Sequence, residues 1–323
     1  MNRTHRNSRF VKGISIGVGM FLISLGASAQ QPSADCSLAV VSRTLKGNTQ
    51  TCDIDVVRRM AKGGHSYAQN QMGLASILVI GADYNAEQAF TWFQRAAQKG
   101  YAPAQVNLSV MYSNGWGTAI NFGAAQHWLR EAADQHFARA YFDLGILYLE
   151  GKGVRQDNDE AFGWFQKGAE AGDSSAQTNL GYMYDKGLGC PRDIARAATL
   201  YRRAAEAGNP LGQNNLADLY LRGEGVVQDN AEALKWFQKA AAQGHTGAEI
   251  TLGYMYANGQ GIARNPETAY MWIKAAQAAG DNRGADMLQS LERGLSAKKL
   301  AEAEEQASKL RLVRKFPANS FLQ

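Results

Sequence analysis

Cysteine, histidine and carboxylate side chains are the groups in this sequence that could do chemistry, as metal ligands, nucleophiles or acid–base pairs. The chain of 323 residues has 3 cysteines, at positions 36, 52 and 190, and 5 histidines. No histidine stands at a metal-ligand spacing from a cysteine or a carboxylate. Most Asp and Glu residues fall where they would cap helices or face solvent, although a paired-carboxylate site stays an open alternative. The sequence therefore predicts no catalytic residue, no metal and no cofactor.

Pairs of glycines separated by one residue are the second feature that could do chemistry, as a cradle for phosphate. A nucleotide-binding fingerprint places such glycines once, after a strand. Here the pair occurs five times, at positions 115/117, 151/153, 187/189, 223/225 and 259/261. Each pair follows a helical pattern, so the first glycine is predicted to end a helix in the left-handed conformation and the second to permit the turn that follows.

The first 29 residues are predicted to be a secretory signal peptide. Four basic residues precede an apolar stretch at 14–25, and the small residues Ala27 and Ala29 supply a cleavage site. Cleavage after Ala29 lowers Lys and Arg from 34 to 30 against 29 Asp and Glu, so the net charge falls from +5 to +1. A near-neutral chain gives no argument for a nucleic-acid partner. No apolar run reaches the length of a membrane span, so we expect a periplasmic or secreted protein without one.

A period of 36 residues runs through the rest of the chain. Its anchor is a small residue, at Ala68, Ala104, Ala140, Ala176, Gly212 and Ala248. Leu or Met follows four residues later and, in five copies, Tyr eight later, so these positions share one face of a helix. A small residue five after the anchor is expected to let a neighbouring helix approach closely.

A second helix follows in each copy. Asp or Asn is predicted to cap it, with capping-box spacing at Asp157, Asp229 and Asn85. This helix is expected to bury a tryptophan, at Trp92, Trp128, Trp164, Trp236 and Trp272, with Leu200 in the fourth copy. No single hairpin can cover its own apolar face, so neighbours must stack. The predicted fold is all-α: a right-handed superhelical solenoid of antiparallel helix hairpins with capping helices at both ends.

The motifs Ala-x3-Leu-Gly-x2-Tyr, Gly-x-Gly, Asp-x3-Ala-x2-Trp and Ala-Ala-x2-Gly closely resemble the Sel-one-like repeat family, a relative of the tetratricopeptide repeats. Residues 180–184 and 236–241 fit that pattern nearly position for position. The resemblance implies an adaptor that holds partner proteins on a superhelical surface. Exported bacterial members resemble regulators of sensor kinases, envelope-assembly factors or inhibitors of secreted toxins. No shared chemistry is implied.

The predicted organisation has four parts. After the signal peptide at 1–29, residues 30–64 form an N-terminal cap in which 52–64 resembles a second helix alone. Cys36 and Cys52 could form a disulfide in this cap, and two free buried thiols are the alternative. Six repeats cover 65–280, and 281–323 form a C-terminal capping helix, from about 283 to 315, and a tail. The second apolar seam of this helix, starting at Leu300, could pack a partner helix, fold back on the repeats or self-associate.

Partner-binding residues are expected at first-helix positions that the core does not fix. The position three after the anchor is always polar and gives Asn107, Asp143, Asn179 and Asn215, with Gln71 and Thr251 at the ends. The position six after it varies and gives Val110, Ile146, Tyr182, Asp218 and Tyr254. Tyr182 and Tyr254 are the expected anchors, because Tyr is enriched at interface hot spots. The alternative is that the polar row forms hydrogen-bond ladders between repeats.

These observations predict an exported scaffold, not an enzyme, that binds another protein on its concave surface. The partner would be an envelope component, for a regulator, or a secreted toxin, for an inhibitor or immunity protein. One alternative is a hydrolase acting on cell wall or β-lactams, as cysteine-rich relatives resemble, but this chain lacks their cysteine pairs within a repeat. Another is a peptidoglycan-binding module, which would need exposed aromatic residues along the groove.

Overall fold

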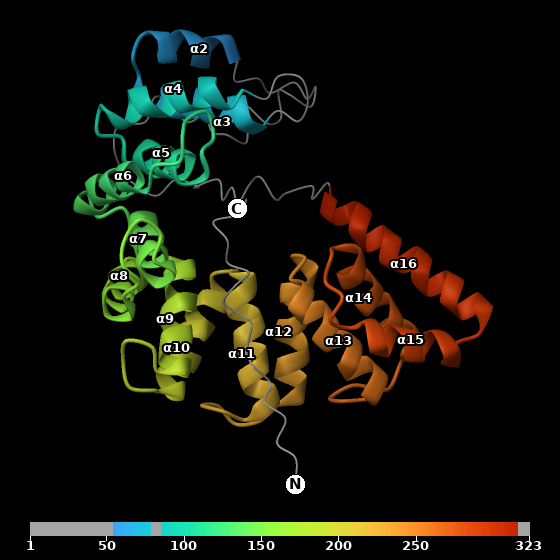
Figure 1. Cartoon of the computed structure of the whole chain (residues 1–323). Coiled ribbons are helices and arrows are strands. Elements are labelled where there is room, and N and C mark those ends of the chain that lie inside the picture. Colours follow the sequence, from blue (N-terminus) through green and yellow to red (C-terminus); the bar gives the residue numbers. More distant parts are fainter. Residues whose placement is uncertain (1–53, 79–84, 316–323) are drawn as a thin grey trace. The chain divides into compact units, whose positions relative to one another are not determined.

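All regular structure in the described residues is helical. The structure, a computed structural model, describes residues 54–78 and 85–315 (Figure 1). They fall into two compact units that divide between Phe137 and Ala138. Within the described ranges, no helix is both long and apolar enough to cross a membrane. The predicted signal peptide and the Cys36–Cys52 pair lie outside the described residues.

The first unit contains one single helix and two hairpins. Its helices are α2 (Ile54–Lys62), α3 (Ser66–Leu78), α4 (Ala86–Ala97), α5 (Ala102–Asn114) and α6 (Phe122–Asp134). Helix α3 pairs with α4, and α5 with α6. Val57 and Ala61 of α2 pack against Ala68, Met72 and Trp92. Helix α2 therefore covers the end of the first hairpin in the place of a missing second helix, as the sequence predicted for this segment.

The second unit contains four hairpins and two C-terminal helices. The hairpin helices are α7 (Ala138–Glu150), α8 (Asn158–Glu170), α9 (Ser174–Lys186), α10 (Ile194–Glu206), α11 (Pro210–Arg222), α12 (Asn230–Ala242), α13 (Thr246–Asn258) and α14 (Pro266–Ala278). Within this unit α8 packs on α9, α10 on α11 and α12 on α13, so its hairpins stack in sequence order. The prediction of an all-α solenoid of antiparallel hairpins is confirmed.

A deeply buried core position of each hairpin lies one residue after the predicted tryptophan, or after Leu200 in the fourth copy. These side chains are at most 2% exposed: Phe93, Leu129, Phe165, Tyr201, Phe237 and Ile273. Trp164 is only partly buried, and the Nζ of Lys167 lies 4.3 Å from its ring centroid. Trp236 is covered in the same way by Lys239, at 4.1 Å. Trp92 and Trp236 are buried, as expected, but the expectation was wrong for Trp128, Trp164 and Trp272, which are partly exposed.

A small residue in the first helix makes room for the deep core side chain of its own hairpin. A Cβ added to Gly145 would lie 2.5 Å from a ring carbon of Phe165, and one added to Gly181 would lie 2.8 Å from Tyr201. Real Cβ atoms do not approach this closely, so a larger residue would push the two helices apart. The predicted close approach at this position is confirmed.

The two glycines of each pair have different tasks. The first ends its helix in the left-handed conformation, with φ between 67° and 71° at Gly115, Gly187, Gly223 and Gly259. The second also has positive φ and meets the preceding repeat. A Cβ at Gly189, where φ is 65°, would lie 2.5 Å from the backbone oxygen of Asn158, at the start of α8. The second glycine therefore sets the distance between stacked hairpins.

Side-chain caps begin the second helices, as predicted. The Oδ1 of Asp193 accepts from Arg196 N at 2.9 Å, and equivalent caps occur at Asn85, Asn121, Asp157, Asp229 and Asn265. The N–H of each cap residue donates to a carbonyl nine residues earlier, as Asp193 does to Tyr184 at 2.9 Å. Because this bond occupies the cap N–H, the capping-box reading of the spacing is wrong: Glu160 and Glu232 have no cap N–H left to bind.

The C-terminal segment forms two helices where the sequence predicted one. Helix α15 (Ala285–Gly294) ends at Leu295, and α16 (Ala297–Lys315) follows. Both pack on α14, with Ala303 and Ala307 of α16 buried. The Tyr270 hydroxyl of α14 donates to Glu304 of α16 at 3.0 Å. Of the three expectations for the second seam, folding back on the repeats is therefore the one that the structure shows.

Candidate partner-binding surface

The structure separates the predicted partner-binding residues into exposed and buried ones. Seven are partly exposed: Asn107, Val110, Asp143, Tyr182, Asn215, Asp218 and Tyr254. Ile146 and Asn179 are only 2% and 5% exposed. The amide of Asn179 donates to the Ser175 carbonyl of its own helix at 2.9 Å, so it is used internally. Both are corrected to core positions, because side chains buried to this degree have almost no area to offer a partner.

Glutamines one residue after the anchor form the hydrogen bonds that link successive repeats. The Nε2 of Gln213 donates to the Ala205 carbonyl, at the end of the preceding hairpin, at 3.2 Å. Gln69, Gln105 and Gln177 donate in the same way at 3.1 to 3.4 Å. The predicted polar row contributes one such link, from Asn107 to Asn70 at 2.9 Å. Hydrogen bonds between repeats therefore exist, but most come from the glutamine one residue after the anchor and not from the polar residue three after it. The recurrence of this glutamine in the sequence could have indicated them.

Tyr182, Asn215 and Asp218 come together on the first helices of the fourth and fifth repeats. All three lie around the buried Tyr201 of α10, to which Asn215 is hydrogen-bonded. Burial chiefly raises the pKa of Tyr201 well above its ordinary value, and Asp185, Tyr182 and Asp218 raise it further. We call the partly exposed Tyr182, Asn215 and Asp218, with Asp185, which is buried and only 7% exposed, the four–five patch. Sequence reasoning found three of its members and missed Asp185.

Ion pairs extend the four–five patch into a chain of alternating charges. Asp185 lies 2.6 Å from Lys186 and 3.9 Å from Arg192, and Asp218 lies 2.7 Å from Arg222. Glu224 joins the two groups, at 3.2 Å from Arg222 and 3.7 Å from Arg192. The pairs of Arg222 with Asp218 and Glu224 are exposed, and such pairs each add at most about 1 kcal/mol to stability. Their consequence here is that charged groups of two repeats are held in fixed positions beside a partly exposed tyrosine.

Burial dominates the electrostatics of the patch. It is the main cause that raises the pKa of Asp218, and Arg222 opposes it. Burial also raises the pKa of Tyr182, with a smaller contribution from Asp185. A tyrosine with a raised pKa keeps its proton at neutral pH and is a hydrogen-bond donor. The patch therefore offers one neutral donor and both signs of charge.

Asp143 belongs to a separate group on α7 and α9. The Nε of Arg139 lies 3.2 Å from both carboxylate oxygens of Asp143. Burial raises the pKa of Asp143, and Arg139 opposes the shift. Asp173, which caps α9, interacts with both residues. Asp143 is thus engaged by its own helix and is a weaker candidate for partner binding than Asp218.

The environments of Cys190 and His245 favour structural roles for these two side chains. Burial raises the pKa of the Cys190 thiol, with Arg196 opposing, so the thiolate form is disfavoured. The Nδ1 of His245 accepts from Ala248 N at 3.2 Å and caps α13. Burial, with Arg283 contributing, lowers the pKa of His245 to about 4. Within 54–78 and 85–315, no three His, Cys, Asp or Glu residues are grouped to hold a metal ion.

The sequence profile of the Sel1 repeat matches six consecutive segments, which together make up more than half of the chain. They are residues 66–101, 102–137, 138–173, 174–209, 210–245 and 248–281. The chain belongs to the Sel1 repeat family. The resemblance read from the sequence is therefore confirmed.

Solved structures of Sel1 repeat proteins share this fold. A Sel1 repeat protein from Oxalobacter formigenes is 37% identical, with 66% of this chain and 85% of that chain covered and a TM-score of 0.60. A protective antigen of uropathogenic Escherichia coli is 24% identical, with 88% and 69% covered and a TM-score of 0.50. An immunity protein from Pseudomonas aeruginosa is 16% identical, with 80% and 84% covered and a TM-score of 0.50. No curated protein matches the chain significantly.

Proposed function

We propose that this Sel1 repeat protein is an exported scaffold that binds another protein through the four–five patch and modulates its activity or placement. The role is binding and not catalysis. The proposal rests on Tyr182 on α9 and Asp218 on α11, which are both partly exposed and both raise the pKa of Tyr201, with Asp218 in a chain of ion pairs. Tyr182, Asn215 and Asp218 are partly exposed, and the deep core of these hairpins is filled by other side chains. Tyr and Arg at such positions are typical of interface hot spots.

Affinity capture with matched variants tests the patch. The bait is the mature protein, and the extract comes from the envelope of cells that express it. The double variant Tyr182→Ala with Asp218→Lys should lose proteins that the unchanged bait retains. The control is Glu206→Lys, the same kind of charge reversal on an exposed residue of α10. Retention of no protein by the unchanged bait, or equal retention by both variants, would contradict the proposal.

Two classes of partner remain to be separated, a secreted toxin and an envelope regulator. The fold shared with a Pseudomonas aeruginosa immunity protein makes a toxin a partner to test, since it shows that the fold can serve such a role. For a toxin, expression of the product of an adjacent gene should stop growth unless this protein is made with it. For an envelope regulator, growth should be unaffected and the captured partner should be an envelope protein.

Export is tested by the N-terminus of the protein isolated from cells. If the signal peptide is removed as proposed, the protein should be found in the periplasm or the medium and should begin at Gln30. A protein that retains Met1 to Ala29 and stays in the cytoplasm would contradict the exported role. It would leave the binding test of the four–five patch in place.

A further inference from the structure

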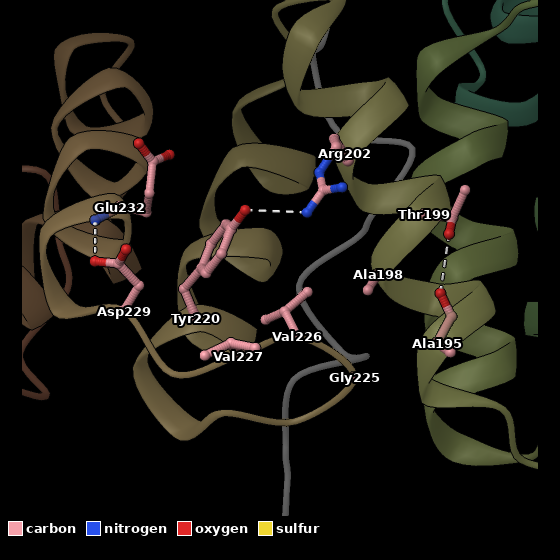
Figure 2. A pocket seen from close by; sticks show the side chains of 10 residues that line it. All are labelled: Ala195, Ala198, Thr199, Arg202, Tyr220, Gly225, Val226, Val227, Asp229 and Glu232. Carbon is pink, nitrogen blue, oxygen red and sulfur yellow. Dashed lines mark hydrogen bonds between the residues drawn. The ribbon is translucent and has the colours of Figure 1, made fainter.

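A hollow of about 410 Å³ lies between α10, α11 and the start of α12 (Figure 2). Its walls include Ala198 and Arg202 from α10, Tyr220 from α11, and Val226 and Val227 from the loop before α12. The hollow and the four–five patch share no residue. Pockets that bind small organic groups have volumes of about 300 to 1,000 Å³, so its size suits a side chain of a partner.

The hollow lies where two other repeats carry an aromatic ring. In two repeats a phenylalanine of the second helix meets the tyrosine 22 residues later, in the next repeat, whereas three other copies carry Gln126, Ala198 and Leu234 at this position. Phe90 and Tyr112 have ring centroids 5.2 Å apart at 87°, and Phe162 and Tyr184 have them 5.3 Å apart at 82°. Ala198 stands 22 residues before Tyr220. Ala198 is the smallest of these residues and lines the hollow, so the hollow occupies the place that a ring fills beside Tyr112 and Tyr184.

The residues that line the hollow could pack against an aromatic side chain of a binding partner. The Tyr220 hydroxyl accepts from Arg202 Nη2 at 3.0 Å, which holds the ring along one side of the hollow (Figure 2). Val227 is 86% exposed and forms an apolar lip, while Val226 is partly buried behind it. Aromatic pairs in edge-to-face geometry gain about 0.5 to 1.5 kcal/mol beyond the area they bury. An incoming ring would recover this contact.

The free donors of Arg202 at the rim of the hollow favour a bound side chain that lies next to a hydrogen-bond acceptor. Asp229 is used to cap α12, and Glu232 accepts from the indole of Trp236 at 3.1 Å. Arg202 forms no ion pair within the described ranges, and its guanidinium has donors beyond the one that binds Tyr220. A main-chain carbonyl next to the guest ring is the acceptor that any peptide supplies.

We propose that this hollow binds the side chain of a phenylalanine in a peptide segment of a partner protein, at the place of the ring missing from position 198. The inference rests on the proposed function, since it assumes a protein partner. Its test does not, because the probe is a small molecule. The four–five patch could bind nothing and the hollow would still take a phenyl ring.

The test is an NMR titration of the mature protein, with its valine methyl groups labelled, by N-acetyl-phenylalanine methylamide. The alanine derivative of the same compound is the matched probe without a ring. The phenylalanine compound should give saturable shifts at Val226 and Val227 with a dissociation constant in the millimolar range, and the alanine compound should not. Absence of saturable shifts with the phenylalanine compound, or equal shifts with both, would overturn the proposal.

Variants that fill the hollow give a second arm. Ala198→Phe restores the pair seen at Phe162 and Tyr184, and Ala198→Leu introduces the residue that the fifth repeat carries at Leu234. Both should abolish the saturable shifts, and Ala198→Phe should also raise the melting temperature. Ala242→Phe, at an exposed position of α12, should bind the probe as the unchanged protein does. Undiminished binding by both filled variants would show that the ring sits elsewhere and would overturn the proposal.

Discussion

Replacing Gly189 by alanine should destabilise the stack of hairpins far more than the same change at Gly172. Both glycines have left-handed backbone, with φ of 65° and 87°. An alanine in this conformation costs about 1 to 2 kcal/mol at either position. A Cβ at Gly172 meets nothing within 4 Å, so its cost ends there. A Cβ at Gly189 would lie 2.5 Å from Asn158 O and 2.8 Å from Asn158 C, which are backbone atoms that cannot rotate away.

The added cost at Gly189 follows from moving one hairpin away from the next. Overpacking of a close-packed interior costs about 1 to 3 kcal/mol, so Gly189→Ala should lose about 2 to 5 kcal/mol in total. Urea unfolding followed by circular dichroism measures both variants against the unchanged protein. The midpoint should fall more in Gly189→Ala than in Gly172→Ala. Equal midpoints would refute the reasoning that the second glycine sets the spacing between repeats.

Three further predictions concern single side chains. Lowering the pH from 6.5 to about 4 should reduce the free energy of unfolding by up to about 3 kcal/mol through His245. The reason is that the pKa of His245 is about 4 in the folded protein, so the unfolded chain takes up the proton first. Urea titrations at several pH values should show a smaller loss in His245→Asn. Phe165→Ala should cost about 3 to 5 kcal/mol and Trp164→Ala less, since only Phe165 is fully buried; calorimetry giving the reverse order would be contrary evidence. Gln213→Ala should cost about 0.5 to 1.5 kcal/mol because the Ala205 carbonyl loses the Gln213 donor and keeps the N–H of Gly208, and chemical denaturation that finds no change would count against the ladder.

The 36-residue period was sufficient to predict the hairpins, because it places Leu, Tyr, Gly and Asp at turns and faces that only paired helices use. It could not decide between Trp164 and Phe165 as the deep core residue. Both are large and apolar, and adjacent residues on a helix point about 100° apart. In the structure the Phe165 ring packs against Gly145, and this contact shows that Phe165 and not Trp164 points into the core.

The candidate site was predictable only in part, because it depends on contacts between repeats. Tyr182 and Asp218 stand out as variable positions, but Asp185 joins them through ion pairs that sequence spacing does not show. Ile146 was misplaced because its position is free in some copies and packed in others. The hollow at Ala198 becomes visible only when residues 22 apart are compared, after the ring pairs at other repeats have been seen.

Photocrosslinking in living cells tests most directly whether the four–five patch binds a protein. A benzophenone amino acid is placed at position 182 in one strain and at position 206 in another, and both are exposed to ultraviolet light. A protein adduct should form from position 182, on the patch, and not from position 206, on the exposed side of α10. No adduct at position 182, or the same adducts from both positions, would contradict the binding role.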